Sequence, residues 1–373
     1  MKIKNAELRF LFFFLPIFFL KLLNITASDK FLVVISIGCL FVASVYYLNQ
    51  KINKRAAGTY VILLGFTALL VLTCGKQGAF FSIIFIILLY NIEDRNNIYT
   101  ICLIVGGIAV LVSCYIERNG VSVLRYNGNE WVRMYKRSNI LYISFYALVN
   151  LAVYRFRDKL LRFKNIILLF IIGYIMYIYT GSRTGFFCFC ILLVLLICSK
   201  SGKIFNRKIF KRGCIIMPAI CMLFSVVTSY CYGEIPIVTE MDRLMQGRIA
   251  QSNMYVNNYS YRLLGQKIYE SYSASDFCNL DNAYMDMLIC YGLIFALLWI
   301  CVSCGTITYL INNKRYLEAV SVVAYSIYGV SETFLPNSFL NVSLFLYADF
   351  VYSFFKTKDS GLVNQNGTTF SRD

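Results

Sequence analysis

The chain contains no histidine among its 373 residues, so any chemistry must come from other side chains. This absence excludes Ser-His-Asp and Cys-His catalysis and any histidine-ligated metal. It leaves carboxylates, Arg, Lys and Tyr as acid, base or electrostatic groups. The functional prediction therefore depends on how these residue types are spaced.

A carboxylate and an amide stand where the chain enters a hydrophobic run after a long polar segment. Asp281 and Asn282 begin that run, and Asp286 follows about one helical turn later. Asn282 and Asp286 are four residues apart, so a helix places them on one face. A carboxylate one turn inside a membrane is costly and normally faces the protein interior or water. Asp281 or Asn282 could instead cap the helix, but capping leaves Asp286 unexplained.

A turn at residues 179–185 joins two other hydrophobic runs and contains Ser182 and Arg183 between glycines. The glycines allow a tight backbone, and an Arg presents a planar donor group that suits a phosphate. An Arg at a helix end can also simply reach the membrane surface. The turn alone is therefore a weak indication of an anion site.

A polar stripe is expected in the run that begins near residue 317. Ser321, Tyr325, Tyr328 and Glu332 follow spacings of four, three and four, which predicts one helix face ending at Glu332. Asn337 and Asn341 would extend this polarity into the next run. Helix packing explains such a stripe as readily as a functional role does.

The composition identifies the environment in which these groups lie. Hydrophobic residues make up 59% of the chain and charged residues 15%, against about 25% charged in an ordinary soluble domain. About a dozen apolar runs approach the roughly 20 residues that a spanning helix needs. The net charge of +17 lies largely in Lys and Arg between these runs, where it acts as a topology signal and makes nucleic-acid binding a poor interpretation.

We therefore predict an all-α, multi-pass membrane bundle of about twelve helices, as one domain over residues 1–373. Basic loops place both termini in the cytoplasm, with a smaller outer loop at 117–138 and one large extracytoplasmic loop at 233–282. The expected spans are 8–23, 31–48, 58–74, 78–90, 98–116, 139–154, 165–180, 185–198, 213–232, 283–310, 317–335 and 338–355.

The large loop has apolar residues at roughly helical spacing among its cations. Met241, Leu244, Met245, Ile249, Val256 and Leu263 alternate with Arg243, Arg248, Arg262 and Lys267. This pattern predicts an amphipathic helical loop on the membrane face, and a solvated linker is the alternative. In the smaller loop, cations accompany aromatic residues, which is typical of anchoring at lipid headgroups.

Four short runs resemble the large-loop pattern of Wzy-type polysaccharide polymerases. They are residues 241–249 (MDRLMQGRI), 263–268 (LLGQKI), 280–284 (LDNAY) and 291–294 (YGLI). The turn Ser182-Arg183-Thr184-Gly185 is similar to one in the same family and in the related O-antigen ligases. The segment order agrees over roughly residues 140 to 355, and the earlier spans match in hydropathy.

The resemblance implies a metal-independent glycosyltransferase of the bacterial inner membrane, without a cofactor. Its donor would be a glycan on undecaprenyl diphosphate, its acceptor a second lipid-linked repeat unit, and its product a capsule or O-antigen polymer. Asp281 or Glu332 would accept a proton, and Arg183 with Arg248 or Arg243 would hold the diphosphate. A flippase and a chain-length regulator are the expected protein partners. The supporting residues would be Ser182, Asn282, Tyr284, Asp286 and Tyr328.

Two alternatives remain open. An O-antigen ligase-like transferase is disfavoured because related ligases carry a histidine near Asp281, whereas this chain has none. A flippase or other secondary transporter would use intramembrane Asp286, Glu332 and Asp349. Transporters tend to place coupling charges near mid-bilayer and to show two repeated halves, whereas these groups are expected to gather beside one long loop.

Overall fold

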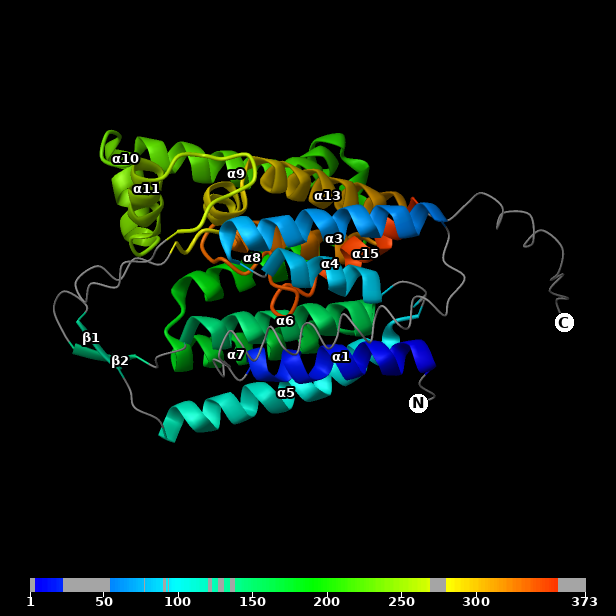
Figure 1. The fold of residues 1–373 in the computed structure, drawn as a ribbon. Coiled ribbons are helices and arrows are strands. Elements are labelled where there is room, and N and C mark those ends of the chain that lie inside the picture. The colour runs from blue at the N-terminus through cyan, green and yellow to red at the C-terminus, as the bar shows by residue number, and fades with distance from the viewer. Residues whose placement is uncertain are drawn as a thin grey trace, which may run out of the picture.

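The computed structural model describes residues 4–22, 54–76, 78–89, 92, 94–119, 123–126, 131–134, 138–268 and 280–354. Within these ranges the chain is a bundle of helices with one short β-hairpin (Figure 1). The longer helices are α1 (Asn5–Leu22), α3 (Lys54–Cys74), α4 (Gly78–Leu88), α5 (Asn96–Asn119), α6 (Ser138–Phe156), α7 (Phe163–Thr180), α8 (Arg183–Ser199), α9 (Lys208–Cys231), α13 (Leu293–Asn312), α14 (Tyr316–Tyr328) and α15 (Leu344–Ser353). Two 3-10 turns, η1 (Arg157–Lys159) and η2 (Lys203–Asn206), follow α6 and α8.

Several helices have the length and composition of membrane spans. In the described part of the chain, five segments meet both criteria: Asn96–Tyr115, Asn139–Phe156, Phe163–Thr180, Lys208–Cys231 and Leu293–Asn312. Shorter apolar helices lie at Gly58–Cys74, Gly78–Leu88, Arg183–Ser199 and Leu344–Ser353. A helix satisfies its backbone hydrogen bonds internally, as a lipid environment requires. The observed helices are therefore compatible with a membrane protein.

The helices from α1 to α9 follow the predicted apolar runs to within a few residues. The predicted run at 31–48 lies outside the described residues. The total of twelve spans therefore stays a prediction.

Aromatic packing joins the first helix to the last. The rings of Phe10 and Phe14 on α1 stack with centroids 5.3 Å apart. Phe14 lies 5.2 Å from Phe85 on α4, and Phe85 lies 4.8 Å from Phe345 on α15. Each of these side chains is buried. Aromatic pairs at these separations stabilise a core beyond the effect of burial alone.

The prediction of one continuous helix over residues 283–310 is wrong. A short helix, α12 (Ala283–Asp286), continues into a π-helical turn, η3 (Met287–Tyr291), and α13 begins only after Gly292. Gly292 has a φ of +93°, a left-handed conformation that favours glycine. The chain therefore changes direction at this residue.

The segment 262–266 packs against this helix break. Gly265 has a φ of +79°, and a Cβ added to Gly292 would stand 2.3 Å from the Gly265 nitrogen. The Gln266 N–H donates to the Cys290 carbonyl over 3.0 Å, and the Leu293 N–H donates to the Arg262 carbonyl over 2.9 Å. The segments 263–268 and 291–294 therefore meet at a glycine crossing.

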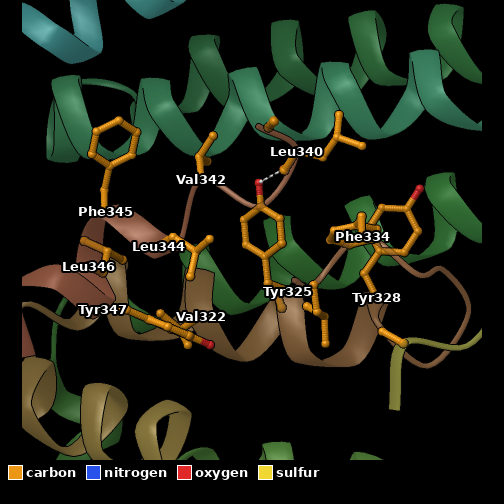
Figure 2. Close-up of a cluster of buried hydrophobic side chains, with 14 of the residues drawn as sticks. Val322, Tyr325, Tyr328, Phe334, Leu340, Val342, Leu344, Phe345, Leu346 and Tyr347 are labelled. Carbon is orange, nitrogen blue, oxygen red and sulfur yellow. Dashed lines mark hydrogen bonds between the residues drawn. The ribbon is translucent and has the colours of Figure 1, made fainter. Parts of the chain in front are cut away.

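The expected helices over residues 317–335 and 338–355 are also shorter than predicted. α14 ends at Tyr328, α15 begins at Leu344, and the backbone between them is irregular. This segment is largely buried, and Figure 2 shows how it packs against α14. The Tyr325 hydroxyl donates to the Leu340 carbonyl over 3.2 Å, and the Asn341 amide donates to the Leu335 carbonyl over 2.9 Å. Irregular backbone can be buried in this way when its polar groups find hydrogen-bond partners.

The elements of the two long connections gather at one end of the bundle, which we call the loop end (Figure 1). The helical pattern expected in residues 233–282 corresponds to α10 (Pro236–Leu244) and α11 (Arg248–Asn258), whereas residues 259–268 are not helical. The smaller connection contains β1 (Val123–Tyr126) and β2 (Trp131–Met134), which pair antiparallel. The first turn of α1 lies at the opposite end.

Candidate functional site

Arg248 is the centre of a buried polar cluster at the loop end. Its side chain is 4% exposed. Nη1 donates to the Thr184 hydroxyl over 2.8 Å, and Nη2 donates to Oε1 of Glu332 over 2.6 Å. Nε lies 4.0 Å from Oδ2 of Asp281. One guanidinium thus joins α8, α11, the start of α12 and the loop after α14.

Residues 241–249 form the turn and the helix cap that position the Arg248 side chain. Gln246 and Gly247 have φ values of +60° and +84°, so the chain makes a tight left-handed turn before α11. The buried Asp242 carboxylate accepts the backbone N–H groups of Ile249 at 2.8 Å and Ala250 at 3.1 Å. Asp242 therefore satisfies free donors at the N-terminus of α11, as a capping residue does. This capping fixes Arg248 at the first position of the helix.

Asn282 has the capping role that the sequence left open between it and Asp281. Its Oδ1 accepts from the N–H groups of Tyr284 and Met285, and its Nδ2 donates to the Ser225 hydroxyl over 3.0 Å. The Asp281 side chain is consequently not needed as the cap, and it lies beside Arg248 with 34% of its surface exposed. Asp281 is therefore the carboxylate of this cluster that solvent can reach, whereas Arg248 and Glu332 are buried.

Glu332 lies beyond the end of α14, in the irregular loop, and its side chain is 8% exposed. Burial raises the pKa of this carboxyl to about 7; Arg248 acts in the opposite direction, and the nearby Asp281 raises the pKa further. The Gly329 carbonyl, at the start of the same loop, accepts the Ala283 N–H over 2.8 Å. This hydrogen bond ties the loop that carries Glu332 to the helix start beside Asp281.

The turn at 179–185 contributes to the cluster through Thr184, whereas Arg183 itself is exposed. Arg183 is the first residue of α8, next to the buried Ser182. Within the described ranges, Arg183 takes part in no ion pair. The structure therefore places Arg183 next to the residue that contacts Arg248, at the accessible surface.

Two buried hydroxyls lie together below this turn. A Cβ on Gly185 would stand 2.8 Å from the Ser182 hydroxyl and 2.8 Å from the Tyr328 hydroxyl, so both oxygens approach the same backbone position. Neither hydroxyl has a hydrogen-bond partner among the described residues. Buried polar atoms of this kind are uncommon and need a specific explanation, such as a bound water or a functional role.

The remaining predicted residues lie apart from Arg248. Arg243 is exposed on α10 and pairs with Glu240 at 2.6 Å, so the structure does not bring it into the cluster. Asp286 is buried and pairs with Lys76 at 2.5 Å. The Tyr284 hydroxyl donates to the Ser326 carbonyl over 2.8 Å and so fixes α12 against α14.

Another group of charges lies at the opposite end of α14. Asp349 pairs with Arg95 and with Arg315, each at 2.7 Å. Glu318 contacts Arg315 at 3.4 Å and Arg157 at 3.5 Å. The thirteen residues of α14 separate Arg315, in this network, from the loop that carries Glu332, a distance of about 20 Å for an α-helix.

The sequence did not single out three residues that make polar contacts with the predicted site residues or fix their position. Thr184 was part of the turn without a role, Asp242 was part of the large-loop run, and Lys76 lay in a short loop. A signal for Lys76 existed, since a cation in a short loop on the expected outer side opposes the positive-inside bias. The 117–138 cations could not be placed, because their side chains lie outside what the structure describes. In the described ranges, no group of three or more Cys, Asp or Glu residues is arranged to hold a metal ion.

The fold and the cluster together describe an α-helical bundle with membrane-length helices and a buried Arg held by carboxylates at one end. In comparisons with protein-family models, with curated proteins and with solved structures, nothing matches this chain. A guanidinium suits a phosphate or diphosphate, and an adjacent carboxylate suits proton transfer.

Proposed function

We propose that the chain is an oligosaccharide repeat unit polymerase of the bacterial inner membrane, acting on the outer face in capsule or O-antigen biosynthesis. The observation that supports this most is the contact of Arg248 with Glu332, Asp281 and Thr184. It combines a diphosphate-binding group with two possible bases in one cluster. The resemblance of four loop runs and the Ser182–Gly185 turn to Wzy-type polymerases supplies the substrate class.

The proposed reaction needs no redox partner. A hydroxyl of the acceptor attacks the anomeric carbon of the donor glycan, and the bond from that carbon to the diphosphate oxygen breaks. The hydroxyl proton passes to Asp281 or Glu332, and the undecaprenyl diphosphate leaves as an anion. Arg248 and the exposed Arg183 stabilise the charge that develops on the leaving group.

The transporter alternative is less well supported by the pairing of its carboxylates. Asp286 pairs with Lys76, Glu332 with Arg248, and Asp349 with Arg95 and Arg315. Glu332 and Asp349 belong to networks at the two ends of α14, whereas coupling sites tend to lie near mid-bilayer. A ligase-like transferase is disfavoured by the absence of histidine from the whole sequence.

We also propose that the loop end faces outward, that both termini are cytoplasmic, and that a flippase and a chain-length regulator act with the enzyme. Introduced cysteines at Gln251 and at Ser201 test the orientation, because these residues lie on α11 and beside η2. A membrane-impermeant reagent should label the first and not the second in intact cells. The reverse pattern would contradict both the orientation and the mechanism.

Deletion of the gene that encodes this chain tests the function in the cell. Single lipid-linked repeat units should remain on the outer leaflet, and long polymer should disappear. Restoration by the unmodified chain but not by Arg248→Gln, at matched expression, would connect the phenotype to the cluster. An unchanged polymer profile would refute the proposal, and accumulation on the cytoplasmic leaflet would favour a flippase.

A further inference from the structure

A second group of cations lies at the loop end, around the glycine crossing. Lys76 follows the last turn of α3, while Arg262 and Lys267 flank Gly265 in the segment after α11. The Thr73 hydroxyl donates to the Leu264 carbonyl over 2.8 Å and so holds the two segments together. Figure 1 shows the segment after α11 lying across the end of α3.

We call Lys76, Arg262 and Lys267 the crossing patch. Each cation is two or three residues from the Thr73–Leu264 hydrogen bond, which limits its backbone to within roughly 11 Å of that bond. Arg262 and Lys267 are exposed, and the Lys76 side chain is 41% exposed. The arrangement therefore places three cations with accessible side chains near this hydrogen bond.

The crossing patch differs from the Arg248 cluster in its charge balance. Arg248 is offset by two carboxylates, Glu332 and Asp281. In the described part of the chain, Asp286 is the one carboxylate paired with a patch residue, and it lies buried behind Lys76. The patch thus retains positive charge for an anion from outside.

Apolar surface adjoins the patch on both sides. Leu69 and Leu72 are exposed on the last two turns of α3, and Leu293 and Leu297 are exposed on the first two turns of α13. Cations above exposed apolar helices provide the two kinds of contact that a lipid with a phosphate headgroup requires. A soluble anion would use the cations alone.

The separation of the two cationic groups fits a reaction between two lipid-linked substrates. The donor reacts at the sugar carbon attached to its diphosphate, whereas the acceptor reacts at the far end of its repeat unit. The two diphosphates must therefore lie about one repeat unit apart. Residues 283–291 separate Asn282, beside the Arg248 cluster, from Gly292 at the crossing, a span on the order of 14 Å at helical rise.

We propose that the crossing patch binds the diphosphate headgroup of the second, acceptor lipid-linked repeat unit. This inference rests on the polymerase function proposed above. Arg262 and Lys267 contact the phosphates, Lys76 joins them from the side of Asp286, and the lipid chain lies along α3 and α13. The Arg248 cluster holds the donor.

The test counts bound lipid on the full chain in phosphatidylcholine nanodiscs by native mass spectrometry, with undecaprenyl diphosphate as the probe. The unmodified chain should bind two equivalents. Arg262→Gln/Lys267→Gln should weaken the binding of the second lipid by about tenfold. Arg248→Gln should lose the first bound lipid and retain the second. Adding Lys76→Gln with Asp286→Asn removes the third cation without leaving a buried charge unpaired.

Arg207→Gln/Lys208→Gln is the matched control, because it removes one exposed Arg and one exposed Lys at the start of α9. It should bind two equivalents. Three results would overturn the inference: one equivalent on the unmodified chain, two equally tight equivalents on the patch variant, or equal displacement of the second equivalent by phosphatidylglycerol. Binding of no undecaprenyl diphosphate at all would instead refute the polymerase proposal itself.

Discussion

Arg248 donates a hydrogen bond to Glu332 over 2.6 Å, and both side chains are nearly inaccessible to solvent. The two residues are 84 positions apart in sequence; Arg248 begins α11, and Glu332 lies in the loop after α14. Removing one partner of such a pair leaves a buried charge and typically costs about 3 to 5 kcal/mol. We propose that this pair takes part in proton transfer beside a bound anion.

The first prediction is a pH dependence centred on Glu332. Burial raises the pKa of its carboxyl to about 7, so a base at this position becomes ionised, and polymerisation becomes faster, as pH rises through 7. If Glu332 rather than Asp281 is the base, Glu332→Gln should remove this rise and slow the reaction roughly a hundredfold or more. Glu240→Gln, which changes an exposed carboxylate on α10, is the control.

The same pKa has a consequence for stability. A carboxyl whose pKa is higher in the folded state stabilises that state at low pH, and this contribution is lost as pH rises through 7. The melting temperature of the unmodified chain in detergent should therefore decline as pH rises from about 4.5 to about 7. If Glu332→Gln gave the same pH profiles for both rate and unfolding, this carboxyl would not be the titrating group.

The second prediction separates Asp281 from its neighbour Asn282. Asn282 caps α12, so Asn282→Ala should lower stability by about 1 kcal/mol. Asp281→Asn keeps the size of the side chain and removes the carboxylate near Arg248, so it should leave the melting temperature unchanged. If Asp281 is the base, this change should lower the rate roughly a hundredfold. A normal rate for Asp281→Asn would assign the base to Glu332.

The third prediction concerns Arg183, which is exposed beside Thr184. Arg183→Lys retains the charge but loses the planar two-point contact with a phosphate. A diphosphate-binding role predicts a clear rise in the donor KM without a change in melting temperature. Arg212→Lys, a cation in α9, should alter neither quantity. An unaltered donor KM would mean that Arg183 only reaches the membrane surface.

The fourth prediction is structural and concerns the glycine crossing. Gly292→Ala adds a Cβ at a φ of +93° and 2.3 Å from the Gly265 nitrogen. The backbone conformation alone costs on the order of 1 kcal/mol or more, and the contact adds to it. The melting temperature should fall, whereas Gly213→Ala in α9, where a Cβ meets nothing within 4 Å, should not lower it. Equal melting temperatures for the two variants would refute the tight crossing.

Local sequence patterns predicted the helices from α1 to α9 because hydropathy and length are local properties. They failed at Gly292 and after Tyr328, where the chain leaves the helix inside apolar sequence. There the deciding contacts come from distant segments: residues 263–268 fill the first break, and the Tyr325 hydroxyl satisfies the Leu340 carbonyl in the second. An apolar run alone cannot reveal such partners.

The site was predictable only in part for the same reason. Asp281, Glu332 and Arg248 were candidates by residue type, and the structure brings them together. Arg243 is only five positions from Arg248, yet it pairs with Glu240 on the surface of α10. Asp242 decides this difference, because it caps α11 and fixes the direction of Arg248. That contact depends on the turn at Gln246 and Gly247.

The central claim is that the Arg248 guanidinium acts in polymerisation, and Arg248→Lys tests it most directly. The measurement is the rate at which purified protein in nanodiscs polymerises a lipid-linked repeat unit, with Arg243→Lys as the matched control on the same loop. Lys cannot contact Thr184, Glu332 and a phosphate at once, so we predict that Arg248→Lys loses at least tenfold in rate and that Arg243→Lys keeps its rate. Equal rates for Arg248→Lys and the unmodified chain, at equal folded content, would contradict the account.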